Sequence, residues 1–296
     1  MTTTLIEPQD PREQGPQPEY PQEPIDPPGT EAEMTPTADH GEQTYVGSDQ
    51  LRDRVALITG GDSGIGRAVA IAFAREGADV LISYLNEEED ARETARLVTE
   101  AGRKALTVGG DISDEAHCQQ LVERAVREWG RIDILVNNAA FQRTYGSIQE
   151  ISAEEWDYTF RTNIYAMFYL SKAALPHMRP GGAIINTTSI QSYQPNPILL
   201  AYATTKGAVT NFTKALAQDV AKQGIRVNAV APGPIWTPLI PSTMPPEKVK
   251  TFGQDTPLGR AGQPAEVAPI FVLLASQAGS YITGQIYGVT GGEPLI

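Results

Sequence analysis

The sequence predicts an α/β fold with a doubly wound, mostly seven-stranded parallel sheet and helices on both faces. Two observations predict this fold. Short runs rich in valine, isoleucine and leucine alternate with longer amphipathic stretches from residue 51 onward. Glycines or polar residues follow five of these short runs, and parallel strands joined by right-handed crossovers bring such residues to one edge of a sheet. Residues 51–296 are therefore predicted to form one domain with a ligand site at that edge.

The apolar runs and the stretches between them define the predicted elements. Strands are expected at 55–59, 79–83, 104–108, 132–137, 183–187, 225–230 and 285–289. Helices are expected at 64–76, 87–101, 115–129, 153–174, 202–222 and 264–275, where apolar residues recur with helical spacing. Strands this apolar are typical of a parallel sheet that is covered on both faces.

Residues 1–50, here called the acidic arm, differ in composition from the rest of the chain. They contain nine prolines, eleven acidic residues and one arginine, so ten of the thirteen excess negative charges lie there. A segment of this kind buries too little apolar surface to offset its ordering entropy. We predict an extended or disordered arm in isolation. Its scattered apolar residues, such as Tyr20 and Met34, suggest packing on its own or a neighbouring subunit, with a solvated tail as the alternative.

A glycine-rich turn follows the first predicted strand and precedes an apolar helix. Gly60, Gly64 and Gly66 lie in this turn, with a spacing that differs from Gly-x-Gly-x-x-Gly. Glycines let the backbone approach a ligand closely, and the N-terminus of the helix offers N–H groups and a positive dipole end to a pyrophosphate. The turn therefore predicts a dinucleotide site in a Rossmann-type domain.

The end of the second predicted strand bears on which dinucleotide binds. At this place an acidic residue would bind the ribose of NAD, and an arginine would bind the 2′-phosphate of NADP. The sequence has neither of them and has Tyr84 and Leu85 instead. The carboxylates at 87–90 suit the first turn of a helix and add negative potential near a 2′-phosphate. Both NAD and NADP therefore stay open, with the balance towards NAD.

Three residues in the second half of the chain predict proton-transfer chemistry. Tyr202 and Lys206 stand at i and i+4, so that the phenol and the ammonium project from one face of a helix. The cation is expected to lower the pKa of the phenol. Ser189 lies thirteen positions before Tyr202, at the end of an apolar run. Each residue alone is commonly structural, and only their joint placement indicates a catalytic site.

With these motifs, residues 51–296 resemble the short-chain dehydrogenase/reductase family in its single-domain form. The resemblance also rests on Pro232-Gly233 and on Asn137-Asn138-Ala139-Ala140, where Ala140 replaces the usual glycine. It implies the catalytic residues Asn163, Ser189, Tyr202 and Lys206. The cofactor contacts expected from the resemblance and from the strand ends are Thr59, Gly60, Asp62, Ser63, Gly64, Ile65, Gly66, Tyr84, Leu85, Asp111, Ile112, Asn138, Ala139, Ala140, Tyr202, Lys206, Pro232, Gly233, Ile235 and Thr237.

The family resemblance implies an NAD(P)-dependent oxidoreductase that interconverts an alcohol and a carbonyl by hydride transfer. Tyr202 would be the general acid/base, Lys206 would hold the nicotinamide ribose and Ser189 would bind the substrate oxygen, while Asn163 would hold a relay water. It also implies a homotetramer. Two alternatives stay open, a dinucleotide-sensing interaction protein that uses the acidic arm and a lyase or epimerase on the same fold.

The substrate is expected to be a small aldehyde, ketone, sugar or polyol, bound by loops that follow the strands. The candidate contacts are Phe141, Gln142, Gln191, Tyr193, Pro195, Trp236, Leu239 and Met244. Residues 234–260, here called the lid segment, are predicted to be mobile and to lack regular structure. Packing of the lid segment itself is the alternative role for its apolar residues.

Composition narrows the remaining function classes. The single cysteine, Cys118, cannot form an internal disulfide, which suits a reducing cytoplasm. The three histidines are far apart in the sequence and predict no metal site. The absence of a Lys/Arg-rich run argues against nucleic acid, and the absence of a long apolar stretch argues against a membrane partner. We therefore expect a cytoplasmic homo-oligomer with a small-molecule substrate.

Overall fold

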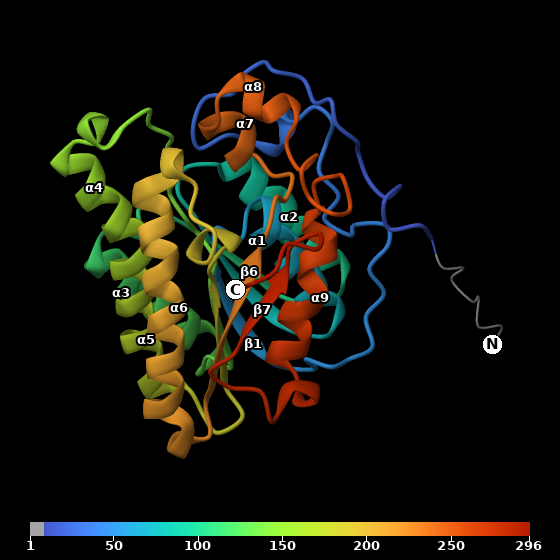
Figure 1. The fold of residues 1–296 in the computed structure, drawn as a ribbon. Helices are drawn as coiled ribbons and strands as arrows, with labels where there is room; N and C mark the ends of the chain where they lie inside the picture. The colour runs from blue at the N-terminus through green and yellow to red at the C-terminus, as the bar shows by residue number, and fades with distance from the viewer. Residues whose placement is uncertain (1–8) are drawn as a thin grey trace.

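The computed structural model describes residues 9–296 and shows a seven-stranded parallel sheet with helices on both faces (Figure 1). The strands are β1 (Val55–Thr59), β2 (Asp79–Tyr84), β3 (Ala105–Gly109), β4 (Ile134–Asn137), β5 (Ala183–Thr187), β6 (Arg226–Pro232) and β7 (Ile286–Val289). Their order is β3-β2-β1-β4-β5-β6-β7, and every neighbouring pair is parallel. The predicted fold class is confirmed. The strand order reverses between β1 and β4, which is where a doubly wound sheet opens a crevice for a ligand.

Two layers of helices cover the sheet. One layer contains α1 (Gly64–Arg75), α2 (Glu88–Glu100) and α9 (Pro264–Ala275), and the other contains α3 (Glu115–Trp129), α5 (Ala166–Ala174) and α6 (Leu200–Val220) (Figure 1). Helix α4 (Ala153–Phe160) continues into α5 through a π-helical turn, η3 (Arg161–Tyr165). Single 3₁₀ turns are η1 (Glu31–Glu33), η2 (Ile148–Glu150), η4 (Leu175–His177), η5 (Ile190–Ser192), η6 (Pro197–Leu199), η7 (Ala221–Gln223) and η8 (Gln277–Gly279).

The alternation of side chains along the strands divides the core into two parts. Ala56 and Ile58 of β1 pack in the cluster with α1 and α9, whereas Leu57 packs in the cluster with α3, α5 and α6. All three side chains are fully buried. Successive residues of a strand point to opposite faces, so a continuous apolar run fills both layers. This packing fixes the carboxyl ends of the strands, where the candidate site lies.

The lid segment has more regular structure than predicted. It contains two short helices, α7 (Leu239–Thr243) and α8 (Pro246–Lys250). Pro246 occupies the first turn of α8, where its missing N–H costs nothing and its fixed φ suits a helix. The expectation of a segment without regular structure was therefore wrong in this part of the chain.

The described part of the acidic arm, residues 9–50, runs along α7 and α8 and then past α1 (Figure 1). Tyr20, Met34 and Ala38 form an apolar cluster with Trp236 and Ile240 of the lid segment. The arm thus lies across its own subunit, while the division of the chain into domains at residue 50 stays a prediction. Among the helices of residues 9–296, none has the length and apolar character needed to cross a membrane.

Candidate active site

One cavity of about 840 Å³ lies along the carboxyl edge of the sheet. Residues that follow β1, β2, β4, β5 and β6 line it, among them Gly60, Leu85, Asn138, Ser189 and Gly233. Every predicted catalytic residue and cofactor contact lines this cavity except Thr59, Gly66 and Asn163. The fold therefore brings the predicted cofactor contacts and three of the four predicted catalytic residues to one place.

Thr59 and Gly66 shape the cavity from behind its wall. The hydroxyl of Thr59 accepts hydrogen bonds from the N–H groups of Asn138 at 3.0 Å and Ala139 at 3.1 Å. A methyl group on Gly66 would lie only 1.8 Å from the carbonyl oxygen of Gly60. The first contact ties the end of β1 to the loop after β4, and the second shows why α1 needs glycine at this position to pack so closely on the turn.

Asn163 lies in the π-helical turn η3 and holds the loop after β4. Its Oδ1 accepts from the N–H of Phe141 at 2.7 Å, and its Nδ2 donates to the carbonyl of Phe141 at 2.9 Å. Nδ2 also donates to the hydroxyl of Thr205 on α6 at 3.0 Å. A second cavity, of about 10 Å³, lies between Asn163 and Lys206, which is roughly the room that one water needs.

Helix α6 places Tyr202 and Lys206 together in the wall of the large cavity. The Nζ of Lys206 lies 5.2 Å from the centre of the Tyr202 ring and donates to the carbonyl of Thr187 at 2.8 Å. The hydroxyl of Ser189 accepts from the N–H of Gln191 at 3.1 Å, and its side chain lies close enough to the Tyr202 phenol to act on the pKa of that phenol. The three side chains come from two elements, the end of β5 and α6, which the sheet and its crossover hold in register.

Burial dominates the electrostatics of this group. It raises the pKa of Tyr202 to about 12, against the opposing effect of the hydrogen bond with Ser189, and it lowers the pKa of Lys206 to about 7. The expectation that the ammonium lowers the pKa of the phenol was wrong for this structure. The spacing correctly placed both side chains on one face of a helix. It gives no information on how deeply the rest of the fold buries them.

Carboxylates gather where the adenosine end of a dinucleotide is expected. Asp62 is buried in the glycine-rich turn, and burial together with the charge of Glu87 raises the pKa of Asp62 to about 7. Its carbonyl accepts hydrogen bonds from Arg67 Nε at 2.8 Å and from the hydroxyl of Thr94 at 2.9 Å. The turn is thereby joined to α1 and α2.

Most of the predicted substrate contacts also line the cavity, namely Phe141, Gln142, Gln191, Pro195, Leu239 and Met244. Tyr193 and Trp236 do not. Trp236 is buried under the acidic arm, where its ring stacks on Tyr20 at 4.1 Å. Pro28 and Gly29 of the arm line the cavity and were missed, because nothing in a Pro-rich segment indicates where it docks.

A glycine-rich turn at the switch point of a doubly wound sheet, opening on a large cavity, defines a dinucleotide-binding α/β protein. The family model described as Enoyl-(Acyl carrier protein) reductase matches residues 60–293. General stress protein 39 of Bacillus subtilis (strain 168) is 55% identical over 90% of this chain and 93% of its own length. NADPH-dependent aldehyde reductase 1, chloroplastic, of Arabidopsis thaliana is 47% identical over 90% of this chain and 94% of its own.

A solved structure agrees with these relatives. The short chain dehydrogenase from Burkholderia cenocepacia J2315 in complex with NADP has a TM-score of 0.77 and 32% identity, and the match covers 82% of this chain and 98% of that one. The chain belongs to the short-chain dehydrogenase/reductase family and is an NAD(P)-dependent oxidoreductase. The family resemblance is confirmed. These relatives give no support to the balance towards NAD, since those that name a cofactor name NADP or NADPH.

Proposed function

We propose that the protein interconverts an alcohol and a carbonyl, with Tyr202 as the general acid/base and a nicotinamide cofactor that supplies or accepts the hydride. The observation that carries this proposal is that Ser189, Tyr202 and Lys206 line the same cavity as the glycine-rich turn. A group that exchanges protons with a substrate oxygen must lie beside the reacting carbon. A shared cavity supplies that proximity, and neither a pure dinucleotide sensor nor a scaffold has a use for it.

The shape of the glycine-rich turn fits a dinucleotide. Gly60 and Gly64 have φ values of 59° and 48°, in the left-handed region that favours glycine. Ile65 and Gly66 follow at the start of α1, where backbone N–H groups suit a pyrophosphate. Thr237 packs on this turn, since a methyl group on Gly64 would lie 3.0 Å from it. We place the pyrophosphate at this turn, the adenosine by Tyr84 and Leu85, and the nicotinamide between Lys206 and Thr237.

The proton has a short route from Tyr202 into the protein. At neutral pH a phenol with a pKa of about 12 keeps its proton, so Tyr202 stands ready to donate to a carbonyl oxygen held by Ser189. Lys206 lies one helical turn away and adjoins the 10 Å³ cavity beside Asn163. A water there would link the Lys206 ammonium to Asn163 and resupply the phenol. The protonated phenol is the form of Tyr202 that reduction of a carbonyl requires.

Amide side chains form part of the polar lining of the cavity. Gln142, Gln191, Gln194 and Asn196 line the cavity beside Phe141. The Nε2 of Gln142 donates to the hydroxyl of Thr243 at 2.9 Å, which links this region to α7. Amides donate and accept hydrogen bonds at once, as hydroxyl groups require. We propose a small aldehyde, ketone, sugar or polyol as the substrate.

A screen of aldehydes, ketones, sugars and polyols with NADPH, NADH, NADP⁺ and NAD⁺ tests this function. We expect absorbance of the reduced nicotinamide at ~340 nm to fall with a carbonyl or to rise with an alcohol. The same screen shows which cofactor the protein prefers. The carboxylates around Asp62 disfavour the 2′-phosphate of NADP(H), whereas the relatives that name a cofactor name NADP or NADPH. Tight binding of a cofactor without turnover of any carbonyl or alcohol would contradict the proposal.

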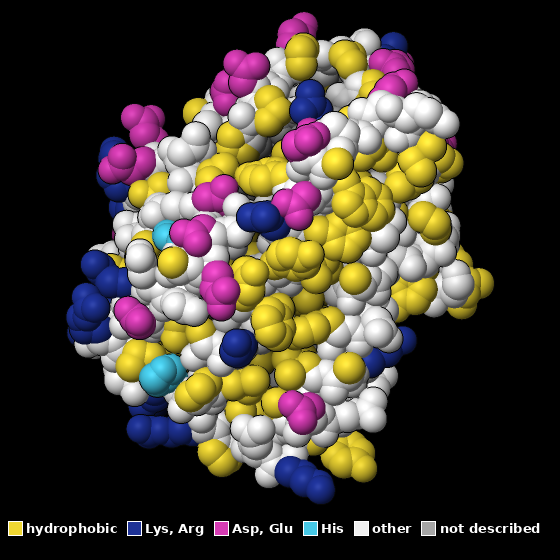
Figure 2. All heavy atoms as spheres, turned by 90° about the vertical axis from the view of Figure 1, so that its left-hand side faces the viewer, with side chains coloured by type: hydrophobic (Ala, Val, Ile, Leu, Met, Phe, Trp, Pro, Cys, Tyr) yellow, Lys and Arg dark blue, Asp and Glu magenta, His cyan; other side chains and the backbone are white. Residues whose placement is uncertain are grey.

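We also propose a homotetramer that uses an exposed apolar face. Figure 2 looks onto the side of α4, α5 and α6, where hydrophobic side chains form a band. Trp156, Tyr165 and Phe168 are large apolar residues exposed on α4, η3 and α5. Apolar patches of this kind are typical of protein contacts.

Replacing Phe168 by aspartate is expected to reduce the assembly, because it places a charge in the centre of this contact. Multi-angle light scattering should give about four times 31.9 kDa for the unaltered chain and a lower mass for Phe168→Asp. Val46→Asp, at a residue of the arm that is 84% exposed, is the matched control and should keep the mass. A monomeric unaltered chain would refute the tetramer.

A further inference from the structure

The acidic arm contacts the lid segment at several points. The ring of Tyr20 stacks on Trp236 at 4.1 Å with an interplanar angle of 12°, and the N–H of Tyr20 donates to the carbonyl of Lys250 at 3.0 Å. The indole N–H of Trp236 donates to the carbonyl of Pro36 at 2.8 Å. The hydroxyl of Ser242 donates to the carbonyl of Pro28 at 3.3 Å. The arm therefore fastens α7 and α8 through both apolar and backbone contacts.

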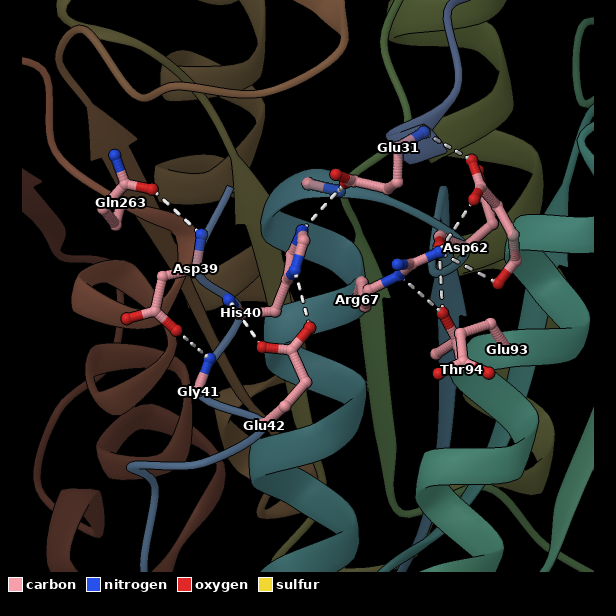
Figure 3. Close-up of polar contacts among 12 residues, drawn as sticks. Glu31, Asp39, His40, Gly41, Glu42, Asp62, Arg67, Glu93, Thr94 and Gln263 are labelled. Carbon is pink, nitrogen blue, oxygen red and sulfur yellow. Dashed lines mark hydrogen bonds and ion pairs between the residues drawn. The ribbon is translucent and has the colours of Figure 1, made fainter. Parts of the chain in front are cut away.

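The same arm fastens the glycine-rich turn through Glu31 (Figure 3). The Oε1 of Glu31 accepts from the N–H of Gly64 at 2.7 Å, at the first residue of α1. The backbone N–H of Glu31 donates to Asp90 Oδ2 at 2.9 Å, and Asp90 in turn forms an ion pair with Arg67 at 3.0 Å. Glu31 is buried. A carboxylate at this place stabilises the dipole of α1 and fixes the backbone of the turn.

A buried histidine holds this carboxylate in place. His40 Nε2 lies 2.8 Å from Glu31 Oε1, and Nδ1 lies 2.9 Å from Glu42 Oε1 (Figure 3). Burial opposes the charged forms, but the hydrogen bonds and charges of the partners prevail, so the pKa of His40 is raised and the pKa of Glu31 is lowered. Arg67 of α1 and Glu93 of α2 also face this group. A protonated imidazole has two N–H donors, one for each carboxylate.

The segment between these two fastenings borders the cavity. Pro28 and Gly29 line it beside Pro238 and Ile240 of the lid segment. A methyl group on Gly29 would lie 3.0 Å from the carbonyl oxygen of Pro238. Three parts of the molecule thus meet here, namely the arm, the lid segment and the start of α1.

We propose that residues 20–42 form a strap that holds the lid segment and the glycine-rich turn in one arrangement, and that Glu31 is a positioning residue for the cofactor. The inference rests on the proposed placement of the pyrophosphate at α1. Glu31 does not line the cavity and bonds the backbone N–H of Gly64, so it acts on the backbone of the turn and not by direct contact with the cofactor. The strap therefore strengthens cofactor binding and does not compete with it.

Cofactor binding by full-length variants tests the strap, with NADPH fluorescence as the readout at neutral pH. We expect Glu31→Ala to raise the Kd roughly three- to tenfold, as for loss of a helix N-terminal carboxylate. Glu31→Gln keeps an acceptor for Gly64 and should lie between. Glu23→Gln removes the same charge from an exposed arm residue and should match the unaltered chain. At saturating cofactor, the kcat of Glu31→Ala should differ from that of the unaltered chain by less than about twofold.

Two further readouts separate positioning from mere stability. Since neutral His40 has one N–H donor for two carboxylates, the Kd of the unaltered chain should rise as pH increases through the raised pKa of His40, and Glu31→Ala should lose this dependence. By reciprocity, NADPH should slow hydrogen exchange in residues 20–42. An unchanged or lower Kd in Glu31→Ala overturns the strap alone. Failure of the unaltered chain to bind NADPH and NADH overturns the proposed function as well.

Discussion

Replacing Tyr202 with phenylalanine is expected to lower kcat by a factor of roughly 10²–10⁴, the usual contribution of a positioned acid or base. The phenol is buried, lies beside Ser189 and is part of the cavity wall, so removal of its oxygen deletes the proton donor while the ring keeps its packing. The Kd of the cofactor should change little, because the glycine-rich turn is untouched. Stopped-flow absorbance of NADPH measures the rate, and fluorescence measures the Kd.

Tyr193→Phe is the matched control for this experiment. Tyr193 ends the same 3₁₀ turn that Ser189 begins, and it does not line the cavity. The control should therefore keep kcat within about twofold. If Tyr202→Phe kept the kcat of the unaltered chain, the assignment of Tyr202 as acid/base would be wrong, and a different proton donor would be needed.

Lys206→Met should abolish turnover and change how stability depends on pH. Burial lowers the pKa of Lys206 to about 7 from 10.5. Between these values the unfolded chain binds a proton that the folded chain does not, so the free energy of unfolding rises with pH. One such proton contributes about 1.4 kcal/mol per pH unit. Methionine has a similar length and does not titrate, so this contribution disappears.

Urea unfolding at several pH values between 7 and 10 measures this effect. Because other groups also titrate, the quantity to compare is the difference in slope between the unaltered chain and Lys206→Met. Lys214→Met, at an exposed position of the same helix, is the matched control and should keep the slope of the unaltered chain. Equal slopes in the unaltered chain and Lys206→Met would show that the folded protein holds Lys206 charged.

The sequence predicted those parts of the site that local patterns determine. Apolar runs predicted seven strands, and the glycine-rich turn was placed correctly because a strand, glycines and a helix follow one another within about twenty residues. Tyr202 and Lys206 were placed on one helix by their spacing of four. In each of these cases the signal and the structure lie in the same short stretch of chain.

The remainder depends on contacts between distant residues. The bond from Gly64 to Glu31 spans 33 positions, and the bond from Trp236 to Pro36 spans 200. A single sequence contains no period or motif for such pairs, so the contacts that dock the arm were not predicted, although its scattered apolar residues suggested that it packs on its own or a neighbouring subunit. The pKa values of Tyr202 and Lys206 depend in the same way on side chains from several elements that exclude water.

The π-helical turn η3 allows side chains of one continuous helical stretch, α4 to α5, to point to two different sides. Asn163 within it points to the backbone of Phe141, whereas Leu170 and Ala174 of the following helix point into the core. A regular helix advances about 100° per residue, so uninterrupted α-helical geometry would fix the angle between these side chains. The wider π-helical turn changes the angle about the helix axis between the side chains before it and those after it. Deleting Thr162 or Ile164 would therefore turn the Asn163 amide away from its loop, even though its hydrogen-bond partners Phe141 and Thr205 remained in the chain.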